Sequence, residues 1–396
     1  MSPALLKTNS RIVIFGDSLI AQTTGSATNY TAFQSTAFIT YALLRINNSL
    51  FLPVNGNKGI SGNTTTQMLA RLGAAVALNP SLVIMDGGTN DAAGGASAAT
   101  IISNLTYIHN AFKAVGAYVV IITIPPRFAP AALSPAAEVV RNTVNTFIKT
   151  LTSETTRAVN LDLVVNNAAF YADGLHFNPT GAFAASTPVT EALLDFVQPT
   201  NLADSFFSDN SFTANPIMAG TTGTKNTATG TIATSWLLDS SSAGGAVVSG
   251  SKTMDNGLNQ QLISISGSYT GNTRSVVLSQ EFNTSSLVAG DVVEAFADIE
   301  IVTADANILD FNVGLLVWTS GYANLANAES ILALDQVPSP LPAGGRYTFR
   351  TPPITIAAGM PAIVRQAVKV DLVDRAGATQ VAASFKVHRI GVRKAL

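Results

Sequence analysis

The first half of the chain alternates short apolar runs with longer segments of helical periodicity. Strands that are apolar at nearly every position must be covered on both faces, and such strands are typical of parallel sheets flanked by helices. The pattern therefore predicts an α/β domain with a three-layer α/β/α arrangement. The expected strands are residues 11–15, 50–54, 81–85 and 118–124, and the expected helices are residues 31–45, 98–115, 136–151 and 181–196.

The pattern changes after Pro199. Runs with a period of two follow one another there, separated by Gly, Asn, Ser and Pro, which is typical of an all-β sandwich or jelly-roll domain. A low-complexity segment, residues 215–230, is expected to form an early strand and turn because Trp236 soon follows. We therefore predict two domains, residues 1–199 and 200–396, with the boundary near residues 197–203. The period-two or aliphatic runs are residues 261–268, 275–280, 291–302, 308–318 and 367–373.

Four short polar segments stand out in the first half of the chain. In chain order they are Phe15-Gly16-Asp17-Ser18-Leu19, Asn57-Lys58-Gly59-Ile60-Ser61-Gly62-Asn63-Thr64, Gly88-Thr89-Asn90-Asp91 and Asp173-Gly174-Leu175-His176. The set and its order resemble the SGNH (GDSL) hydrolase family over about the first half of the chain. The resemblance implies a flavodoxin-like parallel sheet and a serine esterase. The Gly-x-Ser-x-Gly elbow of ordinary α/β-hydrolases is missing, which favours the SGNH branch.

Ser18 is the expected nucleophile. It follows the first predicted strand, where a turn into a helix leaves its backbone N–H without an intrahelical acceptor. Its hydroxyl needs a base, and Asp173 and His176 are three residues apart, a spacing that places both side chains on one side of a helical turn or compact loop. Asp173 would then accept a hydrogen bond from Nδ1 of His176 and leave Nε2 for the Ser18 hydroxyl.

An oxyanion hole is the second expected part of the site. The resemblance implies that the Gly62 N–H and the Asn90 amide complete this hole with the N–H of Ser18. A residue without a Cβ can approach the reacting carbonyl closely, and an amide is a neutral donor at any working pH. Gly59 is expected only to permit a turn, and Asp91 to have only a turn or cap role.

Other polar residues are assigned structural roles. Asp17 is adjacent to Ser18 and projects in a different direction, so we expect it to accept hydrogen bonds from nearby N–H groups and shape the turn. His109 and His388 have no acid three residues earlier and are expected to be packing or surface residues. Asn178, followed by a proline, is expected to cap a helix and fix the loop that carries the base.

Composition excludes several classes of function. Lys and Arg total 22 against 24 Asp and Glu, and the charged fraction is 12%, compared with about 25% in typical proteins. Without a basic stripe, nucleic acid is not an expected partner. Cysteine is absent, as are phosphate loops and His-carboxylate clusters with metal-ligand spacing, so neither a cofactor nor a metal is expected. No signal peptide and no run of the ~20 apolar residues that span a bilayer is evident, so we expect a soluble chain without membrane insertion.

The expected reaction is hydrolysis of a small acyl ester, acetyl in particular, on a polysaccharide. This expectation comes from the resemblance and from the second domain, which is similar to carbohydrate-binding modules. Trp236, Trp318 and Tyr322 are candidates for stacking on sugars, although burial is the commoner outcome for such residues.

Localisation and assembly follow from the same resemblance. Similar family members with a trailing jelly roll occur in bacteriophage tails, which implies an extracellular virion location and a homo-oligomer, a trimer in that setting; otherwise a cytoplasmic location is expected. Two alternatives stay open. One is a glycan-binding virion or surface adhesion module whose hydrolase fold is only a scaffold, and the other is a lipase or thioesterase of the same family.

Overall fold

The computed structural model describes residues 5–27, 30–200, 212–271, 274–282, 287–305, 307–333, 345–359, 363–373 and 380–395. The chain divides into two compact units. Unit 1 comprises Met1–Gly25 and Gln34–Thr200, and unit 2 comprises Ser26–Phe33 and Asn201–Leu396. A division at Thr200 lies inside the predicted interval, whereas the sequence analysis assigned residues 26–33 to the first domain.

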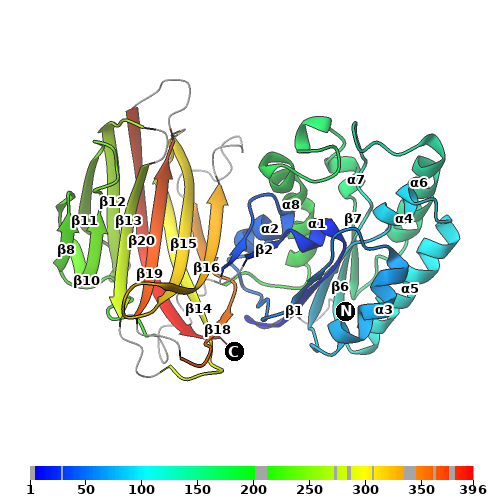
Figure 1. Ribbon diagram of the computed structural model, residues 1–396, viewed down its shortest axis with the longest axis horizontal. Coiled ribbons are helices and arrows are strands. Elements are labelled where there is room, and N and C mark those ends of the chain that lie inside the picture. The colour runs from blue at the N-terminus through cyan, green and yellow to red at the C-terminus, as the bar shows by residue number, and fades with distance from the viewer. Residues whose placement is uncertain are drawn as a thin grey trace. The chain divides into compact units, whose positions relative to one another are not determined.

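Unit 1 is built on a five-stranded sheet in which every described strand pair is parallel (Figure 1). The strand order is β4-β1-β5-β6-β7, so the order reverses at β1. Ligands of open α/β sheets bind at the carboxyl ends of the strands beside such a switch point. The strands are β1 (Ile12–Gly16), β4 (Asn57–Gly59), β5 (Leu82–Met85), β6 (Tyr118–Ile122) and β7 (Thr156–Val159).

Helices cover both faces of this sheet, which confirms the predicted α/β/α fold class (Figure 1). On one face α3, α5 and α6 enclose a core in which the rings of Phe15 and Phe112 lie 5.5 Å apart. Over the other face α2 packs on α8, with the rings of Tyr41 and Phe183 also 5.5 Å apart. The helices are α1 (Ser18–Ala21), α2 (Phe38–Arg45), α3 (Thr65–Val76), α4 (Thr89–Ala93), α5 (Ala98–Ala114), α6 (Pro135–Lys149), α7 (Leu161–Val164), η1 (Ala168–Phe170) and α8 (Pro179–Leu194).

Two of the expected elements differ in the structure. Residues 50–54 were expected to form the second strand, but Phe51 makes only an isolated bridge with Arg11. Pro53 has no N–H to donate and Asn55 adopts a positive φ of 61°, so the extended segment stops and the second sheet strand is β4. The helix expected over residues 31–45 begins only at Phe38, because the residues before it form β3 (Tyr30–Phe33).

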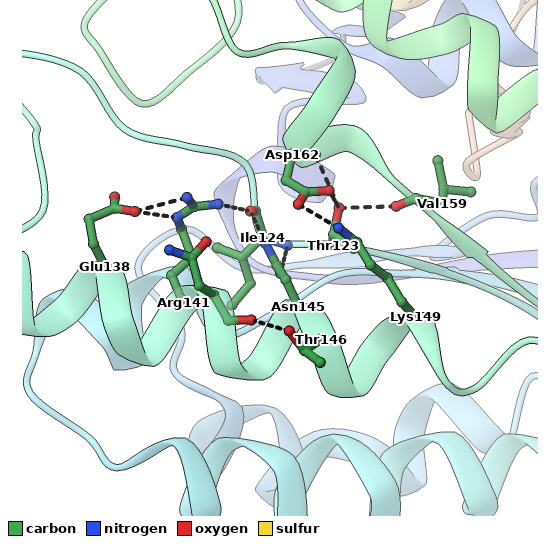
Figure 2. A network of polar contacts seen from close by, with 10 residues as sticks. Thr123, Ile124, Glu138, Arg141, Asn145, Thr146, Lys149, Val159 and Asp162 are labelled. Carbon is green, nitrogen blue, oxygen red and sulfur yellow. Dashed lines mark hydrogen bonds and ion pairs between the residues drawn. The ribbon is translucent and has the colours of Figure 1, made fainter.

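A polar network holds the chain where it leaves β6 (Figure 2). Asn145 accepts a hydrogen bond from the N–H of Ile124 at 2.7 Å and donates one to the carbonyl of Ile124 at 2.9 Å. Arg141 donates to the same carbonyl at 3.1 Å. Beside them, the Thr123 hydroxyl donates to the Asp162 carboxylate at 2.8 Å. Buried backbone groups need such partners, so this network determines the direction in which the next loop starts.

Unit 2 is an all-β sandwich of two sheets, as predicted. Each of the five predicted runs falls in a long strand, and the segment at residues 215–230 contains two short ones. The eight-stranded sheet has the order β2-β3-β16-β15-β19-β13-β10-β8, and the seven-stranded sheet has the order β17-β14-β20-β12-β11-β9 with β18 paired to β14. The strands are β2 (Thr24–Ala27), β3, β8 (Thr222–Asn226), β9 (Thr229–Gly230), β10 (Ile232–Asp239), β11 (Val247–Asp255), β12 (Leu258–Ser268), β13 (Arg274–Phe282), β14 (Val292–Thr303), β15 (Ile308–Trp318), β16 (Asn324–Ala333), β17 (Arg346–Arg350), β18 (Ile354–Thr355), β19 (Ile363–Leu372) and β20 (Gln380–Lys394).

Strand β3 explains why residues 26–33 belong to unit 2. It pairs in parallel with β16, with Tyr30 opposite Asn327 and Ala32 opposite Glu329. The Tyr30 hydroxyl also donates to the Glu329 carboxylate at 2.9 Å. This pairing joins residues almost 300 positions apart, which sequence periodicity does not reveal.

The core of unit 2 contains large aromatic side chains. Trp236 is 1% exposed and donates through Nε1 to the carbonyl of Asn215 at 3.1 Å, so it is a core residue and is not available to stack on a sugar. The rings of Phe311 and Phe385 pack edge to face at 5.2 Å. Among the described residues, no helix is both long enough and apolar enough to cross a membrane.

Candidate active site

Ser18 is the first residue of α1, directly beyond the carboxyl end of β1. Asp17 is the N-cap, and its Oδ1 accepts a hydrogen bond from the N–H of Leu19 at 3.1 Å, the turn-shaping contact that was predicted. The N–H of a first helical residue has no intrahelical acceptor, so that of Ser18 is left for a ligand. Gly16 is required here, because a Cβ at this position would lie 1.6 Å from Oδ1 of Asp86.

The imidazole of His176 lies between Ser18 and Asp173. Its Nε2 is 2.9 Å from Oγ of Ser18, and its Nδ1 is 2.7 Å from Oδ2 of Asp173. Because Nδ1 faces a carboxylate, it carries the proton and leaves Nε2 as the acceptor for the serine hydroxyl. The structure thus brings together the nucleophile, base and acid expected from the sequence.

Asp173 is held in an ionised form by its hydrogen bonds. Oδ1 accepts from the N–H groups of Leu175 at 2.9 Å and His176 at 2.7 Å, while Oδ2 accepts from the His176 ring. Partial burial would raise the pKa of Asp173, but these hydrogen bonds outweigh it and lower the pKa to about 2. The carboxylate is therefore anionic throughout the neutral range and stabilises a positive charge on the imidazole.

The loop that carries His176 is fixed at both ends. Gly174 has a φ of 82°, and a Cβ there would lie 2.2 Å from the carbonyl oxygen of Phe128, so glycine is needed for both conformation and packing. The Phe128 N–H donates to the Gly174 carbonyl at 2.9 Å. After the loop, Asn178 caps α8 by accepting from the N–H of Gly181 at 2.9 Å, as predicted.

The two further oxyanion candidates come from neighbouring connections. Gly62 lies between β4 and α3 with a φ of 78°, and no atom lies within 4 Å of the position that a Cβ would occupy. Asn90 lies in α4, just after β5, and its Nδ2 donates to the carbonyl of Asn63 at 3.0 Å. An amide nitrogen carries two hydrogens, and this hydrogen bond uses one of them.

Arg127 is a residue of the site that the sequence analysis missed. Its Nη2 donates to the Asn90 amide oxygen at 3.3 Å and to the Thr89 carbonyl at 3.0 Å, and its Nε donates to the Thr89 hydroxyl at 2.9 Å. Burial lowers the pKa of this guanidinium from its ordinary value, and the charges of Asp17 and Asp173 oppose that effect. Arg127 lies in the loop after β6, and no local sequence pattern connects it with Asn90.

A buried pair of carboxyl groups lies next to Ser18. The Asp17 N–H donates to Oδ1 of Asp86 at 3.0 Å, and both side chains are less than 5% exposed. Among the described residues, Oδ2 of each has no hydrogen-bond partner. Burial raises the pKa of Asp17 to about 6, and burial together with the neighbouring Asp17 raises the pKa of Asp86 well above its usual value. A proton is therefore retained on this pair more readily than on exposed carboxylates.

Of two minor roles assigned from the sequence, that of Gly59 differs in the structure and that of Asp91 is confirmed. Gly59 lies in β4 rather than in a turn, and a Cβ there would lie 2.2 Å from the backbone nitrogen of Ala21, so its role is close packing against α1. Asp91 has the cap role that was expected, since it accepts from the N–H of Thr65, the first residue of α3, at 2.8 Å and from the Thr65 hydroxyl at 2.6 Å. It thereby ties the start of α3 to α4.

His109 and His388 have the structural roles that were predicted. Nε2 of His109 is 2.9 Å from the Thr156 hydroxyl, and Nε2 of His388 is 2.8 Å from the Glu300 carboxylate. Both rings are less than 7% exposed, and burial lowers the pKa of each. Within the described part of the chain, neither ring is hydrogen-bonded to a serine.

Comparison with known families agrees with this geometry. Residues 14–182 match the sequence model of the GDSL-like Lipase/Acylhydrolase family. The N-terminal part of the chain is a domain of this family. The matched region contains all four polar segments that carried the resemblance, so the GDSL-like domain includes Ser18, Asn90, Asp173 and His176. No curated protein sequence matches the chain.

Several solved structures are similar to one or other part of the chain. A lipase/acylhydrolase from Enterococcus faecalis is 21% identical and has a TM-score of 0.38; the match covers 48% of this chain and 98% of that one. A variant of an acetyl-xylooligosaccharide esterase from Geobacillus Stearmophilus is 17% identical and has a TM-score of 0.37; the match covers 48% of this chain and 96% of that one. A structure described for carbohydrate-binding modules of the β-sandwich superfamily is 10% identical and has a TM-score of 0.31; the match covers 40% of this chain and 57% of that one.

Proposed function

We propose that the GDSL-like domain is a serine carboxylic-ester hydrolase whose triad is Ser18, His176 and Asp173. The contact that carries the proposal is the 2.9 Å approach of His176 Nε2 to Ser18 Oγ. A serine hydroxyl becomes nucleophilic when an adjacent base removes its proton, and that base is effective when a third group fixes its tautomer. Asp173 is the third group, at 2.7 Å from Nδ1.

In the proposed mechanism Ser18 Oγ attacks the ester carbonyl carbon and its proton passes to Nε2 of His176. The negative charge on the carbonyl oxygen is stabilised by the N–H groups of Ser18 and Gly62 and by the Asn90 amide. His176 then protonates the leaving alkoxide, and the C–O bond to the alcohol breaks to leave an acyl-serine. Water deprotonated by His176 attacks this acyl group and releases the acid, and Ser18 regains its proton.

The proposed substrate is a small acyl ester, O-acetyl in particular, on a polysaccharide. The side chains of His176 and Asp173 are 34% and 54% exposed, so the base and acid are open to solvent, whereas Ser18 is 6% exposed. The groups around it are polar, as shown by the contacts of Asn90 and Arg127. A polar site suits a small acyl group on a large hydrophilic alcohol better than it suits a long alkyl chain.

Replacing the nucleophile tests the proposal. Ser18→Ala is expected to lower kcat for p-nitrophenyl acetate by at least roughly 10³-fold while the unfolding temperature stays unchanged. The matched control is Ser103→Ala, because Ser103 is an exposed residue in the middle of α5. Turnover of Ser18→Ala at the rate of Ser103→Ala would refute the assignment. Comparing acetyl, long-chain acyl and acyl-CoA substrates separates the proposed acetylesterase from a lipase or thioesterase.

A further inference from the structure

A groove of about 160 Å³ lies on the eight-stranded sheet of unit 2. Residues of β13, β15, β16 and β19 line it, and each of these strands has a neighbour on both sides in the sheet. Their backbone N–H and C=O groups are therefore used in strand pairing. Because a bound strand needs a free sheet edge, a ligand of this groove must be recognised by side chains.

Strand register explains why the sheet is hollow at this point. Gly314 of β15 pairs with Ala367 of β19, and the next residues on the same face are the longer pairs Asn312 with Lys369 and Leu316 with Arg365. Side chains two residues apart in a strand share one face, so the two smallest residues form a floor between long neighbours. A Cβ at Gly314 would meet its nearest atom, Oδ1 of Asn312, at 3.8 Å, an ordinary van der Waals contact, so a side chain can be accommodated there.

One wall of the groove is a fixed acceptor. Oε2 of Glu329 accepts hydrogen bonds from the Tyr30 hydroxyl and from the Asn312 amide, both at 2.9 Å. These two donors hold the carboxylate in place, and a carboxylate has further lone pairs on its other oxygen. A ligand in the groove therefore meets an oriented acceptor that has already lost rotational freedom.

The other side of the groove is a fixed donor. Arg365 donates through Nη2 to the Ser279 hydroxyl at 3.0 Å, and its buried Nε has no hydrogen-bond partner within the described part of the chain. Lys369 adds a second cation, which pairs with Asp371 at 2.7 Å. The guanidinium cannot accept hydrogen bonds, so only a ligand that accepts can bind on this side.

The balance of charge decides which class of ligand fits. Arg365 and Lys369 carry two positive charges. Negative charges lie beside both, on Glu329, on the Asp371 partner of Lys369 and on Glu281, which is opposite Arg365 in the strand register. An anion would face the carboxylate of Glu329, and a cation would face the guanidinium of Arg365, so each would meet a like charge. A hydroxyl group can donate to the Glu329 carboxylate and can accept from the Arg365 guanidinium.

Aromatic side chains lie next to the donor side. The guanidinium of Arg365 lies 5.8 Å from the centroid of the Trp318 ring, and the Tyr322 ring lies 5.6 Å from Trp318 at 57°. Tyr322 is 59% exposed. Rings combine an apolar face with a polar edge, and the groove floor is apolar, so this region matches a ligand with hydroxyl groups around its rim and C–H groups on its faces.

We infer that this groove binds a neutral saccharide, with Gly314 and Ala367 as its floor and Glu329 and Arg365 as its oriented acceptor and donor. The inference goes beyond the proposed esterase and does not depend on it, because every lining residue belongs to unit 2. Pyranose rings carry hydroxyls that both donate and accept, and they have no charge to oppose Glu329 or Arg365.

The test is a glycan array probed with the full-length protein, followed by calorimetric titration of the best ligand. The array includes neutral, uronic-acid, sialylated and sulfated glycans. We expect neutral glycans to bind and Gly314→Leu, which fills the groove, to weaken binding at least 10-fold. Gly73→Leu is the matched control, because it adds the same side chain to open surface on α3.

The variants must first be shown to be folded and active. Gly314→Leu must retain the unfolding temperature and p-nitrophenyl acetate turnover of the parent; if it does not, Arg365→Met, which removes the donor and keeps the aliphatic stem, takes its place. Binding to no neutral glycan, or binding only to acidic glycans, would overturn the inference. Neutral-glycan binding that survives both groove variants would overturn it as well. Esterase activity is scored separately, so its loss does not affect this result.

Discussion

Asn90 donates from its amide nitrogen, and Arg127 determines which way that amide faces. The guanidinium bonds Oδ1 of Asn90, so Nδ2 is directed toward Asn63 and the proposed oxyanion hole. Thr89 holds the guanidinium through two further hydrogen bonds. Arg127 therefore acts on the reaction through Asn90 and is a positioning residue.

Replacing Arg127 tests this role. Arg127→Met keeps the aliphatic stem and removes the hydrogen bonds, so we expect kcat for p-nitrophenyl acetate to fall by roughly 10–100-fold with little change in KM, since loss of a whole oxyanion donor costs about 10²–10³. In the double variant with Asn90→Ala the two effects should not add, because residues that act as a unit are coupled. Additive losses, or a change confined to KM, would contradict the assignment.

The buried Asp86 predicts a pH dependence of stability. Burial and the neighbouring Asp17 raise the pKa of Asp86 well above its usual value in the folded state, and burial raises the pKa of Asp17 to about 6. A carboxyl group with a raised pKa binds its proton more tightly in the folded protein than in the unfolded chain. The resulting stability is fully present below the unfolded-state pKa of about 3.9 and is lost as the pH rises through the folded-state pKa. Asp86→Asn removes this titration and keeps an oxygen to accept from the Asp17 N–H.

Urea unfolding of the parent and Asp86→Asn at pH 4.5 and 7.5 measures the effect. The parent should lose stability between pH 4.5 and 7.5, and the variant should not lose this contribution. The difference in the free energy of unfolding, variant minus parent, should therefore rise by on the order of 1–3 kcal/mol between these pH values. Arg141→Lys, which alters a buried polar contact without removing a carboxyl group, is the control. A relative stability that does not change with pH, or that falls, would contradict the buried-pair interpretation.

At the scale of elements, periodicity predicted best where an element is buried on two faces. Strands β1, β5 and β6 consist almost entirely of buried apolar residues, and each was placed within two residues of its observed bounds. Strand β4 has the sequence Asn-Lys-Gly, and β7 is an edge strand with a threonine and an arginine. Neither has a hydrophobic pattern, so neither was predicted.

Helix α3 was missed despite a local signal. Its N-cap Thr64 accepts from the N–H of Gln67, and Gln67 bonds back to the N–H of Thr64. This capping box is readable as a threonine followed three residues later by glutamine. In contrast, Arg127 could be placed in the site only from tertiary contacts, because nothing local connects it with Asn90.

At the scale of the whole molecule, the chain enters unit 2 twice. After α1 it leaves unit 1, contributes β2 and β3 to the eight-stranded sheet and returns. The two ends of this excursion are close, since the Gln34 N–H donates to the Thr23 carbonyl at 3.1 Å. The chain leaves unit 1 only eight residues after Ser18. The segment that follows the nucleophile in the sequence therefore depends on β3, whose partner strand β16 is in the C-terminal half.

Truncation after residue 200 tests this dependence. The shortened chain keeps β3 and loses β16, so we expect an unpaired strand that lowers the unfolding temperature and the soluble fraction. Replacing residues 26–33 in the shortened chain by a short Gly-Ser link should restore both, because the ends are adjacent and a short loop closes at small entropic cost. Equal behaviour of the two shortened chains would show that β3 is dispensable, contrary to the expectation.

The proposed function depends most on Ser18 being the activated nucleophile. Diisopropyl fluorophosphate reacts with such serines, and mass spectrometry of the digested protein locates the adduct. We expect one adduct per chain, on the peptide that contains Ser18. The adduct should be absent in Ser18→Ala and should form much more slowly in His176→Ala. An unlabelled Ser18, or labelling of another residue at the same rate, would contradict it.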